Sequence, residues 1–283
     1  MQQEEMSFWD HLEELRWTLF RIIGSLFLFA ILLFAFMRGE NGIFDGVIMA
    51  PARGDFWTYQ LLCKAGSVFG IITDYCDASF TINVVQIKLA SLFFTHMTTS
   101  FWLALVLAFP YLMYEIWKFI KPALYDNERK NVRWVFLFGT GMFFLGCAVG
   151  YFMVFPVTLR FLATYGLSGT VTEQVSLESY MDNFLMLIFI MGVVFEMPLV
   201  SWLLSKLGLV HRGMFHRYRR HAIVVLLVLA AFITPSSDPF TLSIVFIPLY
   251  GLFELSAFFV RPEPMDDDDD DEEDDELLPA IAD

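Results

Sequence analysis

Residues Leu89 to Tyr114 read LASLFFTHMTTSFWLALVLAFPYLMY, twenty-six consecutive residues without Asp, Glu, Lys or Arg. A second run of the same length, Trp134 to Leu159, also lacks all four. A helix needs about 20 apolar residues to cross a hydrocarbon core of about 30 Å, and buried helices of soluble proteins seldom need such lengths. The composition of the whole chain, 57% hydrophobic and only 18% charged, agrees with helices that cross a membrane. The sequence predicts an integral membrane protein.

Six apolar segments predict an all-α polytopic membrane domain over residues 1–262. Their approximate ranges are 18–36, 92–118, 132–154, 180–204, 222–234 and 242–260, with an extended loop at 37–91. The fifth segment is short, since thirteen helical residues rise about 20 Å, so either the bilayer thins there or segments five and six form one re-entrant hairpin. Prolines within or at the ends of the spans predict kinks or helix ends, and hence a curved, cupped arrangement. These prolines are Pro110, Pro156, Pro198 and Pro248.

The distribution of Lys and Arg predicts the orientation of the chain. Thirteen of the eighteen lie in four segments, 1–21, 118–133, 205–221 and 261–283. Short cytosolic loops carry an excess of these residues, so the two termini and the two basic loops are expected in the cytosol. The loop 37–91 then lies in the periplasm. Residues 263–283 hold thirteen carboxylates and no Lys or Arg, which predicts a disordered, solvated acidic tail on the cytosolic side.

Two cysteines, Cys63 and Cys76, lie in the predicted periplasmic loop. In an oxidising compartment they can pair as a disulfide, although two free thiols remain the alternative. The third, Cys147, lies within an apolar span and is expected to serve packing.

The N-terminal stretch from Ser7 to Arg16 predicts an amphipathic helix on the cytosolic membrane surface. Ser7 followed by Asp10 is typical of a helix start, and apolar residues recur on one face from Phe8 onward. Glu13 and Glu14 then lie near the lipid headgroups, where acids are unusual. The simpler interpretation is a capped helix with solvated acids.

The first basic loop begins at Pro122, which cannot continue the hydrogen-bond ladder of the second span. Asp126 or Asn127 can cap the third span, which places Glu128 in its first turn. Taken alone, Glu128 is explained by its favourable interaction with the positive end of the helix dipole and by a pair with a neighbouring basic residue.

Glu196 lies inside the fourth span, where an ionised carboxylate costs about 2.5–3.5 kcal/mol on insertion scales. It should therefore face a cavity or a partner; Glu254, near the end of the last span, is a weaker case. The sequence contains no catalytic motif and no phosphate-binding loop, so no enzyme activity, cofactor or metal is predicted. Three histidines lie among arginines at 211–221, a pattern more typical of a cytosolic anchor than of a metal site. Any energy source must be an ion gradient or a partner.

These segments resemble the TatC family, the C subunit of the Sec-independent twin-arginine protein translocase. The resemblance rests on SFWDHLEELR at 7–16, YEIWKFIKPALY at 114–125 followed by Glu128-Arg129, Phe195-Glu196-Met197-Pro198, and Ile233-Thr234-Pro235 through Asp238-Pro239-Phe240. It spans about residues 7–50 and 84–260. The segment from about 53 to 83 is longer than usual in the family, and Ala123 and Leu242 replace a frequent Gly and a polar Gln.

The resemblance implies a core receptor subunit in the bacterial cytoplasmic (inner) membrane, which binds twin-arginine signal peptides of folded proteins at the cytosolic surface. It implies export driven by the proton-motive force, assembly with single-span subunits of the TatA and TatB type, self-association, and no nucleic acid partner. The signal-binding residues it implies are Glu14, Arg16, Phe119, Pro122, Leu124, Tyr125, Glu128 and Arg129. For partner docking it implies Glu196, Thr234 and Asp238, and Pro51 resembles a periplasmic cap proline.

On the residues alone, two other classes of protein compete with a translocase receptor. A small-solute or proton-coupled transporter could use Glu196 as its ionisable site, but no internal repeat supports an inverted-repeat design. A membrane-embedded enzyme has less support, because the sequence shows no nucleophile–base pair or metal cluster.

Overall fold

The computed structural model describes residues 8–37, 42–69, 76, 80–120, 132–164, 174–234 and 239–260. Six of the residues predicted for the functional site lie outside the described residues, and so does the whole acidic tail, 263–283. The six are Pro122, Leu124, Tyr125, Glu128, Arg129 and Asp238.

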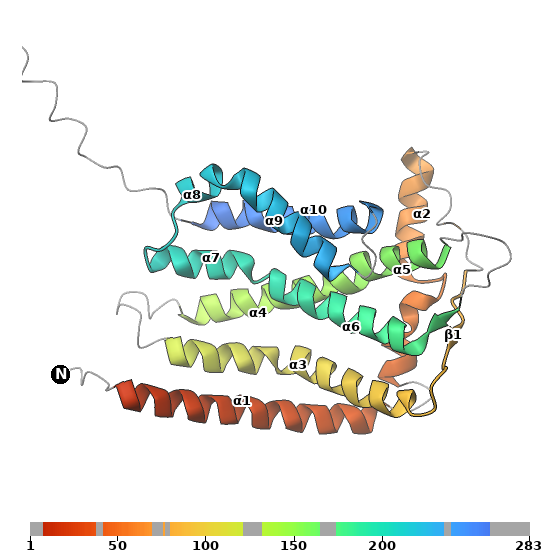
Figure 1. Cartoon of the computed structure of the whole chain (residues 1–283), viewed down its shortest axis with the longest axis horizontal. Helices are drawn as coiled ribbons and strands as arrows, with labels where there is room; N and C mark the ends of the chain where they lie inside the picture. The colour runs from red at the N-terminus through yellow and green to blue at the C-terminus, as the bar shows by residue number, and fades with distance from the viewer. Residues whose placement is uncertain are drawn as a thin grey trace, which may run out of the picture.

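The described chain is almost entirely helical (Figure 1). Its main helices are α1 (Phe8–Phe36), α2 (Trp57–Phe69), α3 (Ser91–Ile120), α4 (Val132–Val149), α5 (Phe155–Thr164), α6 (Leu177–Val194), α7 (Met197–Lys206), α8 (Arg212–Arg217), α9 (Arg219–Ile233) and α10 (Pro239–Phe259). The shorter elements are the π-helices η1 (Phe44–Ile48) and η6 (Gly150–Val154), the 3-10 helix η2 (Ala50–Ala52), and the strands β1 (Val84–Val85) and β2 (Val175–Ser176).

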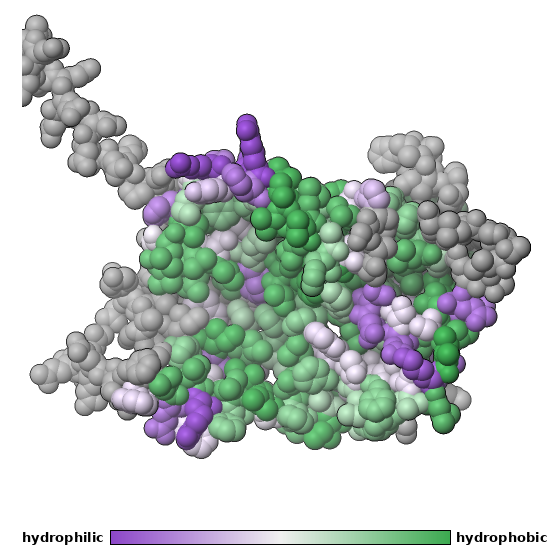
Figure 2. All heavy atoms as spheres, in the orientation of Figure 1, coloured by the Kyte–Doolittle hydropathy of each residue, from purple (hydrophilic) through white to green (hydrophobic). Residues whose placement is uncertain are grey.

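Five helical segments in the described residues are long and apolar enough to cross a membrane. They are Leu12–Phe36, Ser91–Phe119, Leu137–Thr164, Leu177–Lys206 and Pro239–Phe259. They correspond to the predicted spans one to four and six. The predicted fifth span is α9, which has 15 residues and falls short of a typical crossing. Figure 2 shows hydrophobic surface over the middle of the molecule, with hydrophilic residues gathered toward its two ends.

The long helices lie side by side and alternate in direction, so their termini gather at two ends (Figure 1). We call one the basic end; it contains the start of α1, the ends of α3 and α7, and α8. We call the other the disulfide end; it contains η1, η2, α2, the two strands and the Cys63–Cys76 bond. Helix α1 packs along α3, α4 packs on α6, and α10 packs on α7 and α9.

The first span and the N-terminal motif form one helix. The helix predicted over residues 7–16 is present from Phe8 onward, but it is continuous with the predicted first span, because α1 runs without interruption from Phe8 to Phe36. No proline interrupts the stretch, and Gly24, well inside the span, is the first glycine after Phe8. Since adding residues to an existing helix is favourable, nothing here ends it.

The third and fourth spans are interrupted, each beside a proline. In the third, η6 separates α4 from α5, and Pro156 lies in the first turn of α5. In the fourth, α6 ends before Phe195, and α7 restarts with Pro198 in its first turn, where a missing N–H costs nothing. Helices α3 and α10 instead continue through Pro110 and Pro248.

The expected loop at 37–91 is largely structured. It holds η1, η2, α2 and β1, and β1 pairs in parallel with β2, with Val84 opposite Val175. The Tyr180 hydroxyl donates to the Ile48 carbonyl at 2.6 Å, which ties the segment to α6. The main hydrophobic core lies directly beneath, where Phe155, Tyr180 and Phe184 pack edge to face or stacked.

Candidate functional site

The N-terminal acids of α1 lie at the basic end, next to the end of α3. Glu14 is partly buried, whereas the neighbouring Glu13 is exposed and lies 3.9 Å from the Arg16 guanidinium. Arg16 also lies over the Trp17 ring, 5.6 Å from its centre. The two adjacent acids therefore have different surroundings, and only Glu14 is turned partly inward.

An ion pair joins α1 to α3 two turns further along α1. The Arg21 guanidinium donates from Nε to Oε1 of Glu115 at 3.1 Å and from Nη2 to Oε2 at 2.8 Å. Nη2 also donates to the Thr18 hydroxyl at 3.0 Å, and the Tyr111 hydroxyl donates to Oε1 of Glu115 at 2.9 Å. The Glu115 side chain is only 4% exposed. We call these four residues the α1–α3 clamp.

The clamp fixes the rotation of α1 about its axis. A bidentate Arg–carboxylate pair is directional, so it holds both helices in one register. Glu14 precedes Arg21 by seven residues and lies on the same side of the helix, about 10 Å along the axis. The clamp was not predicted from the sequence, although an acid inside the second span and a base inside the first were the visible signal.

Phe119 is the one predicted loop residue that the structure describes. It lies partly buried in the last turn of α3, one turn after Glu115. The residues 121–131 follow directly, and the remaining loop residues of the predicted site lie among them. The described part of the site thus comprises Glu14, Arg16 and Phe119, all at the basic end.

Glu196 lies at the break between α6 and α7, away from this cluster. It is 8% exposed, and neither carboxylate oxygen has a hydrogen-bond partner among the described residues. A methyl group added at Gly139 would lie 3.3 Å from Oε2 of Glu196, 3.0 Å from Cε of Met113 and 2.6 Å from Cδ2 of Leu199. The carboxylate is therefore packed between α3, α4 and α7, with its hydrogen-bonding capacity unused.

Thr234 and Pro51 are both buried and bonded within the chain. The Thr234 hydroxyl donates to the Ala230 carbonyl at 3.0 Å, closing the last turn of α9. The Pro51 carbonyl in η2 lies 2.9 Å from the Tyr59 hydroxyl, which is also 3.0 Å from the Pro156 carbonyl. Tyr59 thereby links η2, α2 and the start of α5.

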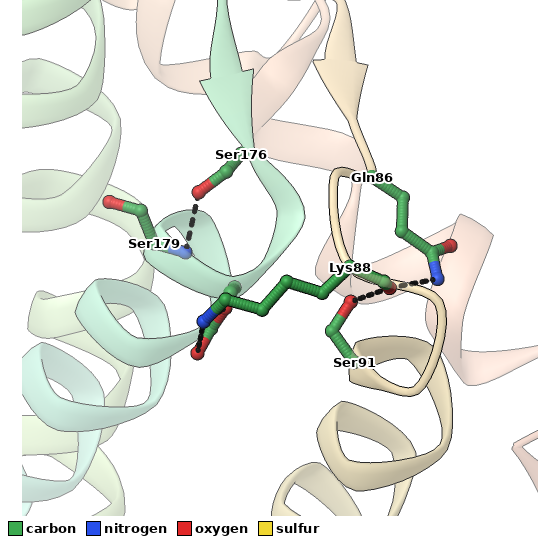
Figure 3. Close-up of polar contacts among 6 residues, drawn as sticks. Gln86, Lys88, Ser91, Ser176 and Ser179 are labelled. Carbon is green, nitrogen blue, oxygen red and sulfur yellow. Dashed lines mark hydrogen bonds and ion pairs between the residues drawn. The ribbon is translucent and has the colours of Figure 1, made fainter.

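The disulfide end is held by covalent and ionic links. Cys63 and Cys76 form a disulfide with their Cα atoms 4.9 Å apart, and Cys147 is a buried free thiol. Figure 3 shows Lys88 reaching from the segment after β1 to the start of α6, where its Nζ lies 2.8 Å from Oε2 of Glu178. Both side chains are exposed, so the pair adds little stability. Across the described ranges, no group of three or more His, Cys, Asp or Glu side chains could hold a metal.

The long apolar helices, the apolar belt and the polar ends define a polytopic α-helical membrane protein. The family model described as Sec-independent protein translocase protein (TatC) matches residues 10–248. The chain is 35% identical to the TatC protein of Blattabacterium sp. subsp. Periplaneta americana over 91% of this chain and 96% of that protein. It is 34% identical to the TatC protein of Deinococcus radiodurans, over 89% and 84%.

A solved structure of a TatC protein is also similar to this chain. The crystal structure of the twin arginine translocase receptor TatC in DDM matches with a TM-score of 0.70 and 26% identity, over 89% of this chain and 99% of that chain. The chain belongs to the TatC family. It is thus a component of the Sec-independent protein translocase of a bacterial membrane, and a transport protein rather than an enzyme.

Proposed function

We propose that this chain is the receptor subunit of the twin-arginine translocase, with six spans and both termini in the cytosol of a bacterium. The positive-inside distribution of Lys and Arg supports this orientation, because Lys118 at the end of α3 and the arginines of α8 and the start of α9 lie at the basic end, together with the start of α1. Helix α9 is the short fifth span. Fifteen residues rise about 22 Å, so the bilayer thins beside it.

The signal peptide is bound, in this proposal, between the start of α1 and the loop after α3. The observation that carries the proposal is the α1–α3 clamp, since it fixes Glu14 beside the end of the helix that leads to Glu128. In this proposal the carboxylates of Glu14 and Glu128 accept the two guanidinium groups of the signal peptide. A guanidinium offers a rigid fork of donors and Lys only a point charge, so Arg-Arg is preferred over Lys-Lys.

The other residues have supporting roles. Arg16, Phe119 and the loop residues shape the site around the two acids; these loop residues are Pro122, Leu124, Tyr125 and Arg129. Glu196, Thr234 and Asp238 contribute to docking of single-span subunits of the TatA and TatB type, and copies of the chain self-associate. Export is driven by the proton-motive force in this proposal; membership of the TatC family supports it, and the sequence shows no nucleotide-binding loop that would supply another energy source.

The test is photocrosslinking of a twin-arginine signal peptide to residues 7–16 in membranes. We expect Glu14→Ala and Glu128→Ala each to abolish crosslinking while the protein still inserts. Glu13→Ala is the matched control, because Glu13 is adjacent, equally charged and exposed, and it should retain crosslinking. Unchanged crosslinking in Glu14→Ala, Glu128→Ala and their double variant would overturn the carboxylate assignment.

A further inference from the structure

Helix α2 lies across the disulfide end of the molecule. Figure 1 shows it running crosswise to the direction shared by α1, α3 and α6. The start of α2 is attached to the third span, because the Thr58 hydroxyl donates to the Phe152 carbonyl. The ring of Phe56, the residue before the helix, also stacks on the Phe152 ring, with the ring centres 6.0 Å apart. The helix therefore has a fixed position relative to the membrane-crossing segments.

One face of α2 presents apolar side chains outward. Trp57 is 59% exposed and Leu61 is 50% exposed, and their spacing of four residues places them on the same face. Tyr59, on the opposite side, and Thr58, next to it, are buried against the protein, whereas the polar Gln60 and Lys64 are exposed beside the apolar pair. The exposed apolar pair is costly in water, and nothing in the described chain covers it.

The exposed face of α2 continues a lipid-facing stripe of the third span. Phe138, Leu145 and Phe152 are all exposed and are spaced by seven residues, so they form one row along the outside of α4 and η6. The Trp57 ring packs edge to face on Phe152, with ring centres 5.9 Å apart. Trp57 and Leu61 thus extend the hydrophobic row at the point where the span ends.

We propose that α2 is an interfacial membrane anchor that places Trp57 and Leu61 among the lipids of the leaflet at the disulfide end. Acyl chains cover the row formed by Phe138, Leu145 and Phe152. Because the exposed face of α2 continues this row, lipid also covers Trp57 and Leu61. Trp is enriched at the level of the headgroups, where its apolar ring and its N–H are both satisfied. A helix lying in the interface plane with one apolar face has the geometry of such anchors.

The Cys63–Cys76 disulfide gives this anchor its stiffness. Cys63 lies within α2, two residues after Leu61, and the bond ties the helix to a residue beyond its C-terminal end. The fastened first turn and the disulfide restrain α2 on either side of the exposed pair. The anchor therefore sets the depth at which the disulfide end of the whole molecule meets the bilayer.

The test places the photoreactive residue p-benzoylphenylalanine at one position at a time in the full chain in native membranes. Positions 57 and 61 test the anchor, position 152 is the lipid-exposed reference, and position 55 is the control, because Asp55 is polar, exposed and only two residues from Trp57. We expect phospholipid adducts at 57 and 61 in amounts similar to 152 and several-fold above 55. Adducts at 57 and 61 with polypeptide instead of lipid, or no lipid adducts there while 152 reacts, would overturn the proposal.

Discussion

Helices α4 and α6 approach each other at Gly146, and the structure predicts what happens when this residue gains a methyl group. A Cβ atom at Gly146 would lie 2.5 Å from the Met191 carbonyl oxygen and 2.7 Å from Cβ of Phe195. Real Cβ atoms essentially never come within 3.0 Å of another heavy atom in this way. Since one obstacle is backbone, Gly146→Ala forces the two helices apart.

The same substitution at Gly141 provides a matched control. Gly141 lies in the same helix, and nothing lies within 4 Å of the Cβ position there. Both substitutions gain the intrinsic helix preference of Ala, about 1 kcal/mol, so this gain cancels in the comparison. Inserting a methyl group into a filled core costs about 1–3 kcal/mol, which is the expected difference in free energy of unfolding between the two variants.

The measurement is thermal unfolding of both purified variants in the same detergent. Gly146→Ala should melt several degrees below Gly141→Ala, and Gly141→Ala should melt at or slightly above the unchanged protein. Equal midpoints for the two variants would refute the close approach of α4 and α6. A double variant that also shortens Phe195 would not restore stability, because the Met191 carbonyl remains in place.

Glu115→Gln removes the charge held by Arg21, so we expect weaker crosslinking of the signal peptide to α1, partly recovered when Arg21→Glu is combined with Glu115→Arg. Normal crosslinking in Glu115→Gln would show that the clamp does not position Glu14. Glu196→Met replaces an unbonded buried carboxylate by a side chain of similar size, so the thermal midpoint in detergent should rise while export falls; a lower midpoint would contradict this. Alkylation without reductant should leave Cys63 and Cys76 unlabelled, and prior reduction should expose both; labelling of both without reductant would disprove the bond.

The spans are the part of the fold that a single sequence predicts well. Charge-free runs of twenty or more residues must be helical in lipid, because every backbone N–H and C=O has to bond within its own segment. Predicted and observed ends differ mainly where helices extend beyond the apolar run, as α1 does toward Phe8 and α5 toward Thr164. The interruption at Phe195–Glu196 was signalled by Pro198, whereas Pro110 carried the same signal without a break.

The polar contacts of the site were harder to predict, because they join residues far apart in the sequence. Arg21 and Glu115 are separated by 94 positions, and nothing local to either residue specifies the other. Helix α2 was missed for a different reason. It has only 13 residues, too few to cross a membrane, so its stretch between two predicted spans was interpreted as a loop. Packing against η6, which no local pattern reveals, gives it a fixed place.

The two buried acids, Glu115 and Glu196, differ in whether hydrogen bonds within the chain compensate for their burial. Glu115 accepts three hydrogen bonds, two from Arg21 and one from Tyr111, so its burial is compensated within the chain. Glu196 is buried to a similar degree without any bond among the described residues, which lowers the stability of the isolated chain. A second molecule that supplies a donor would offset part of this uncompensated cost. We therefore propose that Glu196 contributes to docking, whereas Glu115 is bonded within the chain, and we expect Glu196→Met to stabilise the isolated chain while weakening its complex.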